Sequence, residues 1–280
     1  MKKQKYAVIG ECIENEISPF IHKRLFELAK IDAEYELIDI KAEEMENNMP
    51  RLNKLAGYIV SSPHKVSITN YLDKLDKKAQ FYGAVNTVKN TGGVSKGYIT
   101  DVYGFITAIK ANNMPLEGKV VIIGAGGIAK VIACELAVKG CNPVVAVLPS
   151  ELRQAAKLAM VIKEKVINME IETCRIDRLE GNIDLLINAT PVGTYPDIDA
   201  CAVPESLIKE CKNVIDLIYN PLETKLLKTA KANGANVMNG LSMLIWQAVK
   251  SHKIWNDVEF NTEDIKQLYE DAKKEIMKNE

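Results

Sequence analysis

The stretch VVIIGAGGIAK, from Val120 to Lys130, decides the fold of this chain. Its opening residues are apolar, which is typical of a buried parallel strand. A glycine turn follows with the pattern G-x-G-x-x-G/A, and an apolar helical segment then runs as far as Lys139 and Gly140. Glycines in such a turn let the backbone approach a pyrophosphate, which the N–H groups and dipole of the helix bind. An ordinary tight turn is the alternative, but the order of strand, turn and helix favours a dinucleotide site at Gly124, Ala125, Gly126, Gly127, Ile128 and Ala129.

The position of this unit predicts a complete domain in front of it. Strand-like and helical runs alternate along the chain, which favours an α/β fold with a largely parallel sheet. The expected strands are 6–10, 35–40, 57–62, 84–88, 120–123, 143–148, 184–188 and 213–218. The expected helices include 20–31, 68–80, 101–113 and 242–278, and residues 114–118 are the expected hinge. Asn261 is the expected N-cap of the last helix.

Composition excludes several function classes. The 280 residues include 36 Lys plus Arg and 37 Asp plus Glu, and the net charge of −1 argues against a general nucleic-acid or membrane-surface binder. The apolar run near the amino terminus is too short for a signal peptide, and none approaches the ~18 residues of a membrane span. The 6 cysteines form no C-x-x-C pair and the 3 histidines are scattered, so we expect no metal site and a cytoplasmic protein with reduced cysteines.

Two charged residues directly after expected strands are candidates for acid–base chemistry. Lys65 follows Pro63 in VSSPHK, and Asp101 ends GYITD. A lysine that faces a carboxylate can move a proton to and from the oxygen that changes during hydride transfer. Taken alone, each residue is more often a solvated loop charge.

Four further residues have both a structural and a functional interpretation. Ser18 precedes Pro19 and is expected to be a helix N-cap. Asn86 lies in an expected strand, where Asn is depleted. Tyr219 follows a buried strand, where its hydroxyl would reach the crevice at the strand ends. Gln247 lies among apolar residues and could be a helix-surface amide.

The joint pattern of short motifs is more specific than any one residue. The motifs occur in the order ISPFIH (17–22), SPHK (62–65), GAVNT (83–87), TD (100–101), GAGG (124–127), INAT (187–190), DLIYNPLET (216–224) and NGLSMLIWQA (239–248). This pattern resembles the shikimate dehydrogenase family over nearly the whole chain. The resemblance implies an N-terminal α/β substrate-binding and catalytic domain, 1–110 with 241–280, whose C-terminal helices pack back on it. It also implies a Rossmann nicotinamide-binding domain, 111–240, and a cleft between the two domains.

The resemblance also implies roles for individual residues. Lys65 falls on the catalytic lysine of the family and Asp101 on its partner aspartate. The substrate-contacting positions fall on Glu16, Ser18, Ser61, Asn86, Tyr219 and Gln247. Besides the glycine turn, the cofactor-binding positions fall on Ser150, Thr190, Leu217, Gly240 and Met243.

The substrate end departs from the family at three positions. Glu16 stands where the family has the first of two serines that bind the substrate carboxylate. At ~4 Å and an effective dielectric constant near 20, the repulsion between two carboxylates would be about 4 kcal/mol. Ile59 and Ile99 replace asparagines, while Ser61 keeps the hydroxyl of a threonine. Two interpretations stay open: drift around an unchanged substrate, or a related ring with fewer hydroxyls or no carboxylate.

The cofactor end departs as well. The Asn-Arg-Thr of the family, whose arginine faces the 2′-phosphate of NADP, falls on Pro149, Ser150 and Glu151. Arg153 and Lys157 lie just beyond, whereas Glu151 could accept from the free ribose hydroxyl of NAD. The cofactor is therefore NADP or NAD.

The prediction is a cytoplasmic NAD(P)-dependent oxidoreductase of the shikimate dehydrogenase type that acts on a CH–OH group. The resemblance implies reversible reduction of 3-dehydroshikimate to shikimate, within aromatic amino acid biosynthesis. One alternative is a related cyclic polyol or hydroxy acid, such as quinate or an aminoshikimate. A second is a catalytically idle nucleotide- or metabolite-binding protein. We expect a small-molecule partner, no nucleic acid or membrane, and a monomer or homodimer.

Overall fold

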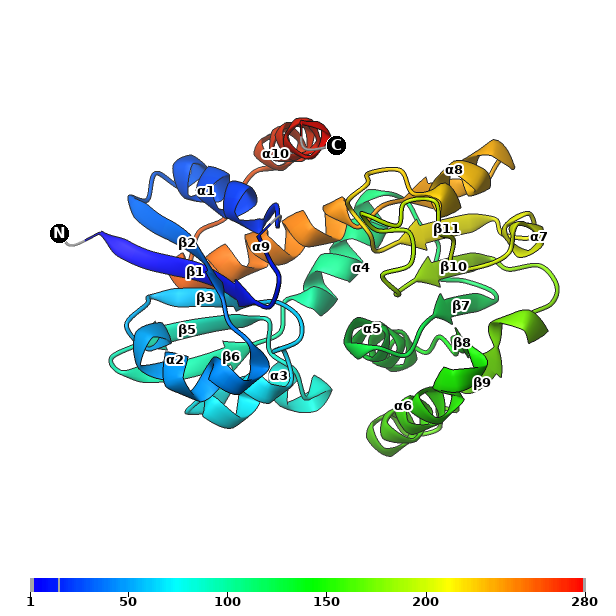
Figure 1. The fold of residues 1–280 in the computed structure, drawn as a ribbon, viewed down its shortest axis with the longest axis horizontal. Coiled ribbons are helices and arrows are strands. Elements are labelled where there is room, and N and C mark those ends of the chain that lie inside the picture. The colour runs from blue at the N-terminus through cyan, green and yellow to red at the C-terminus, as the bar shows by residue number, and fades with distance from the viewer. Residues whose placement is uncertain (1–2, 15, 279–280) are drawn as a thin grey trace. The chain divides into compact units, whose positions relative to one another are not determined.

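The computed structural model describes residues 3–14 and 16–278, and the chain divides into two compact units. Of the described residues, unit 1 comprises those up to Gly104 together with those from Leu244 to Lys278, and unit 2 is Phe105–Met243. The division falls inside two helices, α4 (Asp101–Ala111) and α9 (Leu241–Asn256). Figure 1 shows both units as helices around a sheet, so the predicted α/β class is confirmed.

Unit 1 is built on a mixed six-stranded sheet in the order β2-β1-β3-β5-β6-β4. Its strands are β1 (Gln4–Gly10), β2 (Ala33–Asp39), β3 (Gly57–Val60), β4 (Lys74–Leu75), β5 (Thr87–Thr91) and β6 (Val94–Tyr98). Its helices, besides parts of α4 and α9, are α1 (Ser18–Leu28), α2 (Met45–Leu52), α3 (Lys77–Tyr82) and α10 (Thr262–Met277), with short 3-10 turns at Ala42–Glu44 and Ser67–Tyr71. Strand β1 is parallel to β2 and β3, whereas β5 is antiparallel to β3 and β6.

The helix predicted at 68–80 is wrong. Its place is taken by a 3-10 turn, the edge strand β4 and the short helix α3. Leu72 and Leu75 pack against the core from extended backbone, so their spacing resembles that of a helix face. Helix α3 begins only after Asp76, whose carboxylate accepts from the N–H of Ala79 at 2.7 Å.

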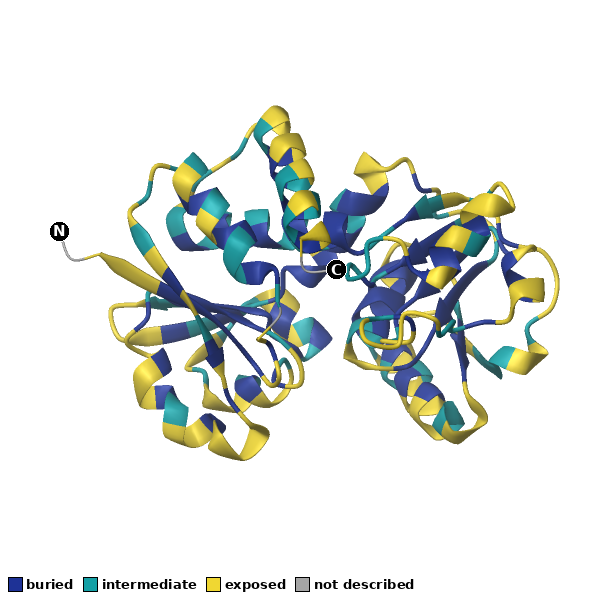
Figure 2. Cartoon of the chain, turned by 45° about the horizontal axis from the view of Figure 1, so that its top comes forward, coloured by how far each residue is buried: buried dark blue, intermediate teal, exposed yellow. Residues whose placement is uncertain are grey.

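Apolar clusters cover the sheet of unit 1. Figure 2 colours much of its central strands as buried. One cluster includes Tyr6, Phe26 and Trp255, which brings α1 and α9 onto β1. The indole N–H of Trp255 donates to the carbonyl of Val88 at 2.8 Å. A Cβ on Gly57 would lie 2.4 Å from that nitrogen, so only glycine fits there. The C-terminal helices therefore belong to this unit.

The last helix begins where the sequence predicts. The side chain of Asn261 accepts from the N–H of Asp264 at 2.8 Å and caps α10. Helix α10 packs against α1 within unit 1. In the part of the chain that the structure describes, no helix is long and apolar enough to cross a membrane.

Unit 2 has a six-stranded parallel sheet in the order β12-β11-β10-β7-β8-β9. Its strands are β7 (Val120–Ile123), β8 (Val144–Val147), β9 (Glu172–Arg175), β10 (Leu185–Asn188), β11 (Asn213–Asp216) and β12 (Asn236–Met238). Its helices, besides part of α4 and α9, are α5 (Gly127–Val138), α6 (Leu152–Lys165), α7 (Glu205–Ile208) and α8 (Lys225–Ala232), with 3-10 turns at Pro149–Glu151 and Ile176–Arg178. Counted from β7, this is the Rossmann strand order, which confirms the predicted class of this unit.

The glycine turn that follows β7 has the expected geometry. Gly124 has a φ of +99°, a conformation that favours glycine, and a Cβ there would lie 2.7 Å from Cγ2 of Thr190. Its N–H donates to the carbonyl of Ala146 on β8 at 2.9 Å. Helix α5 then begins after Gly126, and no side chain caps it. The turn thus leaves the first N–H groups of a buried helix for a ligand.

Candidate functional site

Lys65 and Asp101 form an ion pair in unit 1. Nζ of Lys65 donates to Oδ2 of Asp101 at 2.9 Å. Lys65 lies in the loop after β3, and Asp101 is the first residue of α4. The lysine side chain is 30% exposed and the carboxylate only 2%. A buried carboxylate that holds a partly exposed ammonium is suited to proton transfer with a bound ligand.

Asn86 fixes the carboxylate of this pair. Its Nδ2 donates to Oδ1 of Asp101 and to Oγ1 of Thr100, both at 3.0 Å. Its Oδ1 accepts from the backbone N–H of Thr100 at 2.7 Å. The strand was predicted at 84–88, but β5 begins only at Thr87, so Asn86 lies just before the strand. This explains its presence near a sheet that disfavours Asn. Sequence reasoning missed Thr100 as part of this network.

The same network reaches helix α9. Oγ of Ser251 lies 2.8 Å from Oγ1 of Thr87 and donates to the carbonyl of Gln247 at 2.9 Å. Gln247 itself is half-buried on α9, and its backbone is thus tied to the strand that follows Asn86.

Glu16 and Ser61 form a second pair in unit 1. Oγ of Ser61 donates to Oε1 of Glu16 at 2.6 Å. Burial raises the pKa of Glu16, while the hydrogen bond from Ser61 and the charge of Lys65 act in the opposite direction. The glutamate therefore lies within the electrostatic field of the Lys65 ammonium.

Ser18 is not the N-cap of α1, so that prediction is wrong. The N-cap is Ile17, and Ser18 is the first residue of the helix. The Ser18 hydroxyl is buried and lies 3.3 Å from the hydroxyl of Tyr35 on β2. That tertiary partner, rather than the local helix end, determines its position.

The glycine turn in unit 2 is open at Gly126 and Gly127. A Cβ on Gly126 or Gly127 would meet no atom within 4 Å, and both residues are exposed. Nε2 of Gln154 donates to the carbonyl of Ala125 at 3.0 Å and ties α6 to the turn. Open space over a free helix N-terminus fits a pyrophosphate.

The expected 2′-side of the cofactor lies at the end of β8. Ser150 is exposed, and Oε2 of Glu151 accepts from the N–H of Leu148 at 3.3 Å. Arg153 is an exposed cation in the first turn of α6. The segment that would determine the preference between NADP and NAD therefore contains the carboxylate of Glu151 and the cation of Arg153.

A buried network fixes the loops after β10 and β11. Oδ1 of Asn188 accepts from the backbone N–H of Thr190 at 3.0 Å and from its hydroxyl at 2.7 Å. Nδ2 of Asn188 donates to Oδ1 of Asp216 at 3.0 Å. Asp216 also accepts from the N–H of Ile218 at 3.2 Å and from Oγ1 of Thr224 at 2.6 Å.

Burial raises the pKa of Asp216 to about 6, against the effect of these hydrogen bonds. Sequence reasoning missed Asn188 and Asp216 as site-building residues. The available signal was their position, because each is a polar residue that ends a buried parallel strand.

The remaining predicted cofactor positions lie beside that network in unit 2. The N–H of Gly240 donates to the carbonyl of Ile218 at 2.9 Å, and a Cβ on Gly240 would lie 2.0 Å from the carbonyl oxygen of Leu217. Gly240 directly precedes α9, and Met243 is buried in the first turn of that helix. Tyr219 is half-buried in the loop after β11.

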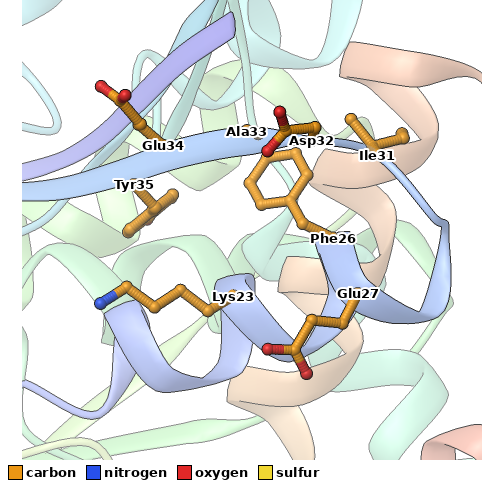
Figure 3. Close-up of a pocket in the computed structure, with 8 residues that line it drawn as sticks. All are labelled: Lys23, Phe26, Glu27, Ile31, Asp32, Ala33, Glu34 and Tyr35. Carbon is orange, nitrogen blue, oxygen red and sulfur yellow. The ribbon is translucent and has the colours of Figure 1, made fainter. Parts of the chain in front are cut away.

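One hollow in unit 1 borders Ser18, because its lining includes Tyr35, whose hydroxyl lies 3.3 Å from that of Ser18. Figure 3 shows it between α1 and β2, lined by Lys23, Phe26, Glu27, Ile31, Asp32, Ala33, Glu34 and Tyr35. None of its lining residues is a predicted site residue. Within residues 3–14 and 16–278, no group of three or more His, Cys, Asp or Glu could hold a metal ion.

Comparisons with known proteins show what the chain is similar to. The family described as "Shikimate dehydrogenase substrate binding domain" matches residues 8–88. A curated relative, the shikimate dehydrogenase (NADP(+)) of Caldanaerobacter subterraneus subsp. tengcongensis, is 38% identical over 276 residues, which is 97% of each chain.

Two solved structures are similar over nearly the whole chain. A shikimate dehydrogenase in complex with NADP+ has a TM-score of 0.88 and 37% identity, covering 96% of both chains. The ligand-free 5-ketofructose reductase of Gluconobacter sp. strain CHM43 has a TM-score of 0.81 and 30% identity, covering 97% of this chain and 99% of that one.

A Rossmann unit combined with a second α/β unit that carries a lysine–carboxylate pair defines a dehydrogenase of the two-domain, nicotinamide-dependent class. The chain belongs to the shikimate dehydrogenase family.

Proposed function

We propose that this chain catalyses the reversible, NADP(H)-dependent reduction of 3-dehydroshikimate to shikimate. The observation that carries the proposal is the ion pair between Lys65 and Asp101, with Asn86 fixed behind it. The name of the curated relative that matches 97% of the chain supports this substrate pair. The reaction interconverts a ring ketone and a secondary alcohol, so it needs one hydride and one proton.

Lys65 is the residue that moves the proton. Its ammonium donates a proton to the ketone oxygen during reduction and recovers it from the hydroxyl in the reverse direction. Asp101 holds the ammonium 2.9 Å from its own oxygen. Asn86 keeps the carboxylate oriented through the other oxygen. Such positioned acid–base groups contribute typically about 10²–10⁴-fold to the rate.

The chain binds its cofactor through unit 2 in this proposal. NADPH, when bound, supplies the hydride from its nicotinamide ring. The free helix N-terminus at Gly126 and Gly127 takes the pyrophosphate, and Arg153 supplies a cation toward the 2′-phosphate. The other residues proposed to line this site are Ala125, Ser150, Thr190, Leu217, Gly240 and Met243.

A steady-state assay tests the proposal. Shikimate, quinate and uncharged cyclic polyols are offered with NADP+ and with NAD+, and NAD(P)H formation is followed by absorbance. We expect turnover of shikimate with NADP+ above that with NAD+. Binding of cofactor without turnover of any compound would contradict the proposal and favour an idle nucleotide-binding protein.

An uncharged polyol or ketose is the second candidate substrate class. The observation that favours it is Glu16, a carboxylate in the electrostatic field of Lys65. The similar 5-ketofructose reductase shows by its name that one protein of this fold acts on a ketose.

The cellular location, the oligomeric state and the partners of the chain are also proposals. We propose a cytoplasmic protein that is a monomer or homodimer and has no nucleic-acid or membrane partner. The unpaired cysteines, which include Cys12 and Cys211, fit a reducing compartment. Light scattering of the purified chain would measure its oligomeric state.

A further inference from the structure

Two hydrogen bonds hold helix α9 on strand β5 through residues outside the candidate site. The indole N–H of Trp255 donates to the carbonyl of Val88, and Nζ of Lys89 donates to the carbonyl of Ile254, both at 2.8 Å. Trp255 also packs in the apolar cluster on β1 and α1. The last turn of α9 is therefore fixed on the sheet, and the helix needs no further polar contact to stay there.

A third polar contact between the same two elements lies one turn earlier in the helix. Oγ of Ser251 is 2.8 Å from Oγ1 of Thr87, the first residue of β5, and 3.4 Å from Oγ1 of Thr100. All three residues are buried. Thr87 directly follows Asn86 and Thr100 directly precedes Asp101. Ser251 therefore contacts both residues that adjoin the hydrogen bond between the amide and the carboxylate.

The protons of these hydroxyls can be assigned, because each hydroxyl has only one. Oγ of Ser251 donates to the backbone carbonyl of Gln247 at 2.9 Å, and a carbonyl can only accept. Ser251 therefore accepts from Thr87. The Thr87 hydroxyl also lies 3.2 Å from Oδ1 of Asn86, but its single proton goes to the nearer oxygen, that of Ser251.

This assignment leaves Oδ1 of Asn86 with two donors, which fill its two lone pairs. They are the N–H of Thr100 at 2.7 Å and the hydroxyl of Thr100 at 3.2 Å. A third donor, the Thr87 hydroxyl, would compete with them for the same oxygen. Such competition would turn the amide and weaken the 3.0 Å bond from Nδ2 of Asn86 to Oδ1 of Asp101.

We propose that Ser251 is a positioning residue for the proton-transfer pair. It draws the proton of the Thr87 hydroxyl away from Asn86, so that the amide stays directed at the carboxylate that holds Lys65. Ser251 itself is buried and acts through Thr87 and Asn86. The inference rests on the proposed function for the proton transfer, and it adds a residue of α9 to the groups that control it.

Replacement of Ser251 by alanine tests the inference in the full chain. Ser251→Ala keeps the helix, because alanine has the highest helix propensity and the bonds of Trp255 and Lys89 remain. We expect kcat for shikimate oxidation to fall about fivefold, an effect typical of one hydrogen bond, and KM to change less than about twofold. The loss falls on kcat because proton transfer, rather than binding of the ring, depends on the orientation of the carboxylate. An unchanged kcat in a folded but less stable protein would overturn the inference.

A second background shows whether Ser251 acts through Thr87. Thr87→Val removes the hydroxyl proton that Ser251 accepts. In this background we expect Ser251→Ala to change kcat less than about twofold, because no competing donor is left. An equal fold-loss of kcat in the two backgrounds would overturn the inference.

Ser95→Ala is the matched control. Ser95 is a buried serine at the other end of the β5–β6 hairpin, and its hydroxyl donates to Oδ2 of Asp73 at 2.7 Å. We expect this variant to lose stability in chemical denaturation and to keep the wild-type kcat. An equal loss of kcat in Ser95→Ala and Ser251→Ala would overturn the inference, because it would show a general effect of lower stability.

Turnover by the wild type separates failure of the inference from failure of the proposed function. Wild-type oxidation of shikimate with an unchanged kcat in Ser251→Ala overturns the inference alone. If the wild type oxidises another ring instead of shikimate, the proposed substrate is wrong, and the same variants are compared on that ring. If no compound is oxidised with either cofactor, there is no proton transfer for Ser251 to control, and both are overturned.

Discussion

Each unit buries an aspartate near the ends of its strands, but the groups that hydrogen-bond to the two carboxylates differ in charge. Asp101 in unit 1 pairs with a lysine, whose Nζ is 2.9 Å away. Asp216 in unit 2 is fully buried, and its hydrogen bonds come from the neutral groups of Asn188, Ile218 and Thr224. The lysine partner of Asp101 carries a proton and is partly exposed. The neutral partners of Asp216 belong to the surrounding loops, which their hydrogen bonds hold in place. The difference indicates chemistry in unit 1 and positioning of loops in unit 2.

Among the changes that test this comparison, removal of the Lys65 side chain should have the largest effect, a loss of kcat. We expect Lys65→Ala to lower kcat by about 10²–10⁴-fold, because the proton donor is lost, while the Kd for NADP+ stays the same. Lys78→Ala, at an exposed position on α3, is the control. Stopped-flow or steady-state absorbance measures the rate, and calorimetry measures the Kd. A Lys65→Ala protein with wild-type kcat would show that the ion pair is structural.

Truncation of the aspartate in unit 2 should reduce stability. Asp216→Ala leaves Nδ2 of Asn188 and the N–H of Ile218 buried without their acceptor. We expect a loss of about 2–6 kcal/mol in the free energy of unfolding, because each of the two unsatisfied groups costs ~1–3 kcal/mol. Chemical denaturation measures it. Asp216→Asn keeps an acceptor oxygen and is the control, and equal losses in the two variants would contradict this account.

The ionisation of Asp216 should give a smaller, pH-dependent effect. Its pKa is about 6 in the folded chain against an ordinary 3.8, so the folded state binds a proton that the unfolded state releases. Its contribution to the free energy of unfolding is at most about 3 kcal/mol. This contribution is fully present below pH ~4 and is lost as pH rises through about 6.

The buried pair His22 and His252 acts in the opposite direction. Burial lowers the pKa of both rings, that of His252 to about 3, so their contribution falls as pH falls below about 6.5. Both histidines are present in the wild type and in Asp216→Asn, so the difference in unfolding free energy between these two proteins isolates the effect of Asp216. This difference should shift in favour of Asp216→Asn as pH rises from 4 to 7. A difference between the two proteins that does not change with pH would contradict the raised pKa.

The sequence predicted those parts of the fold that local signals determine. The buried strand at 120–123 and the turn at Gly124 depend on adjacent residues, and the cap at Asn261 depends on a residue three positions away. The short edge strands β4, β9 and β12 were not predicted, because pairing with a neighbouring strand defines them. A run of two to four residues carries too little periodicity to reveal such pairing.

As with the fold, only part of the candidate site could be predicted from the sequence. Lys65 and Asp101 both follow strands, and strand ends of one sheet meet, so their proximity could be expected. The partner of Ser18 could not be expected, because Ser18 begins α1 whereas Tyr35 lies on β2, and only the tertiary fold brings them together. Asp216 was missed because a buried carboxylate shows its role only through the donors that surround it.

Replacement of Asp101 by asparagine tests the central claim most directly. Asp101→Asn keeps the shape and one acceptor oxygen for Asn86, but removes the charge that holds the Lys65 ammonium. The measurement is kcat for shikimate oxidation beside the Kd for NADP+ in the same preparation. We predict that kcat falls at least tenfold while the Kd changes less than twofold. An unchanged kcat, or a Kd that weakens in proportion to the loss of rate, would contradict the assignment of proton transfer to this pair.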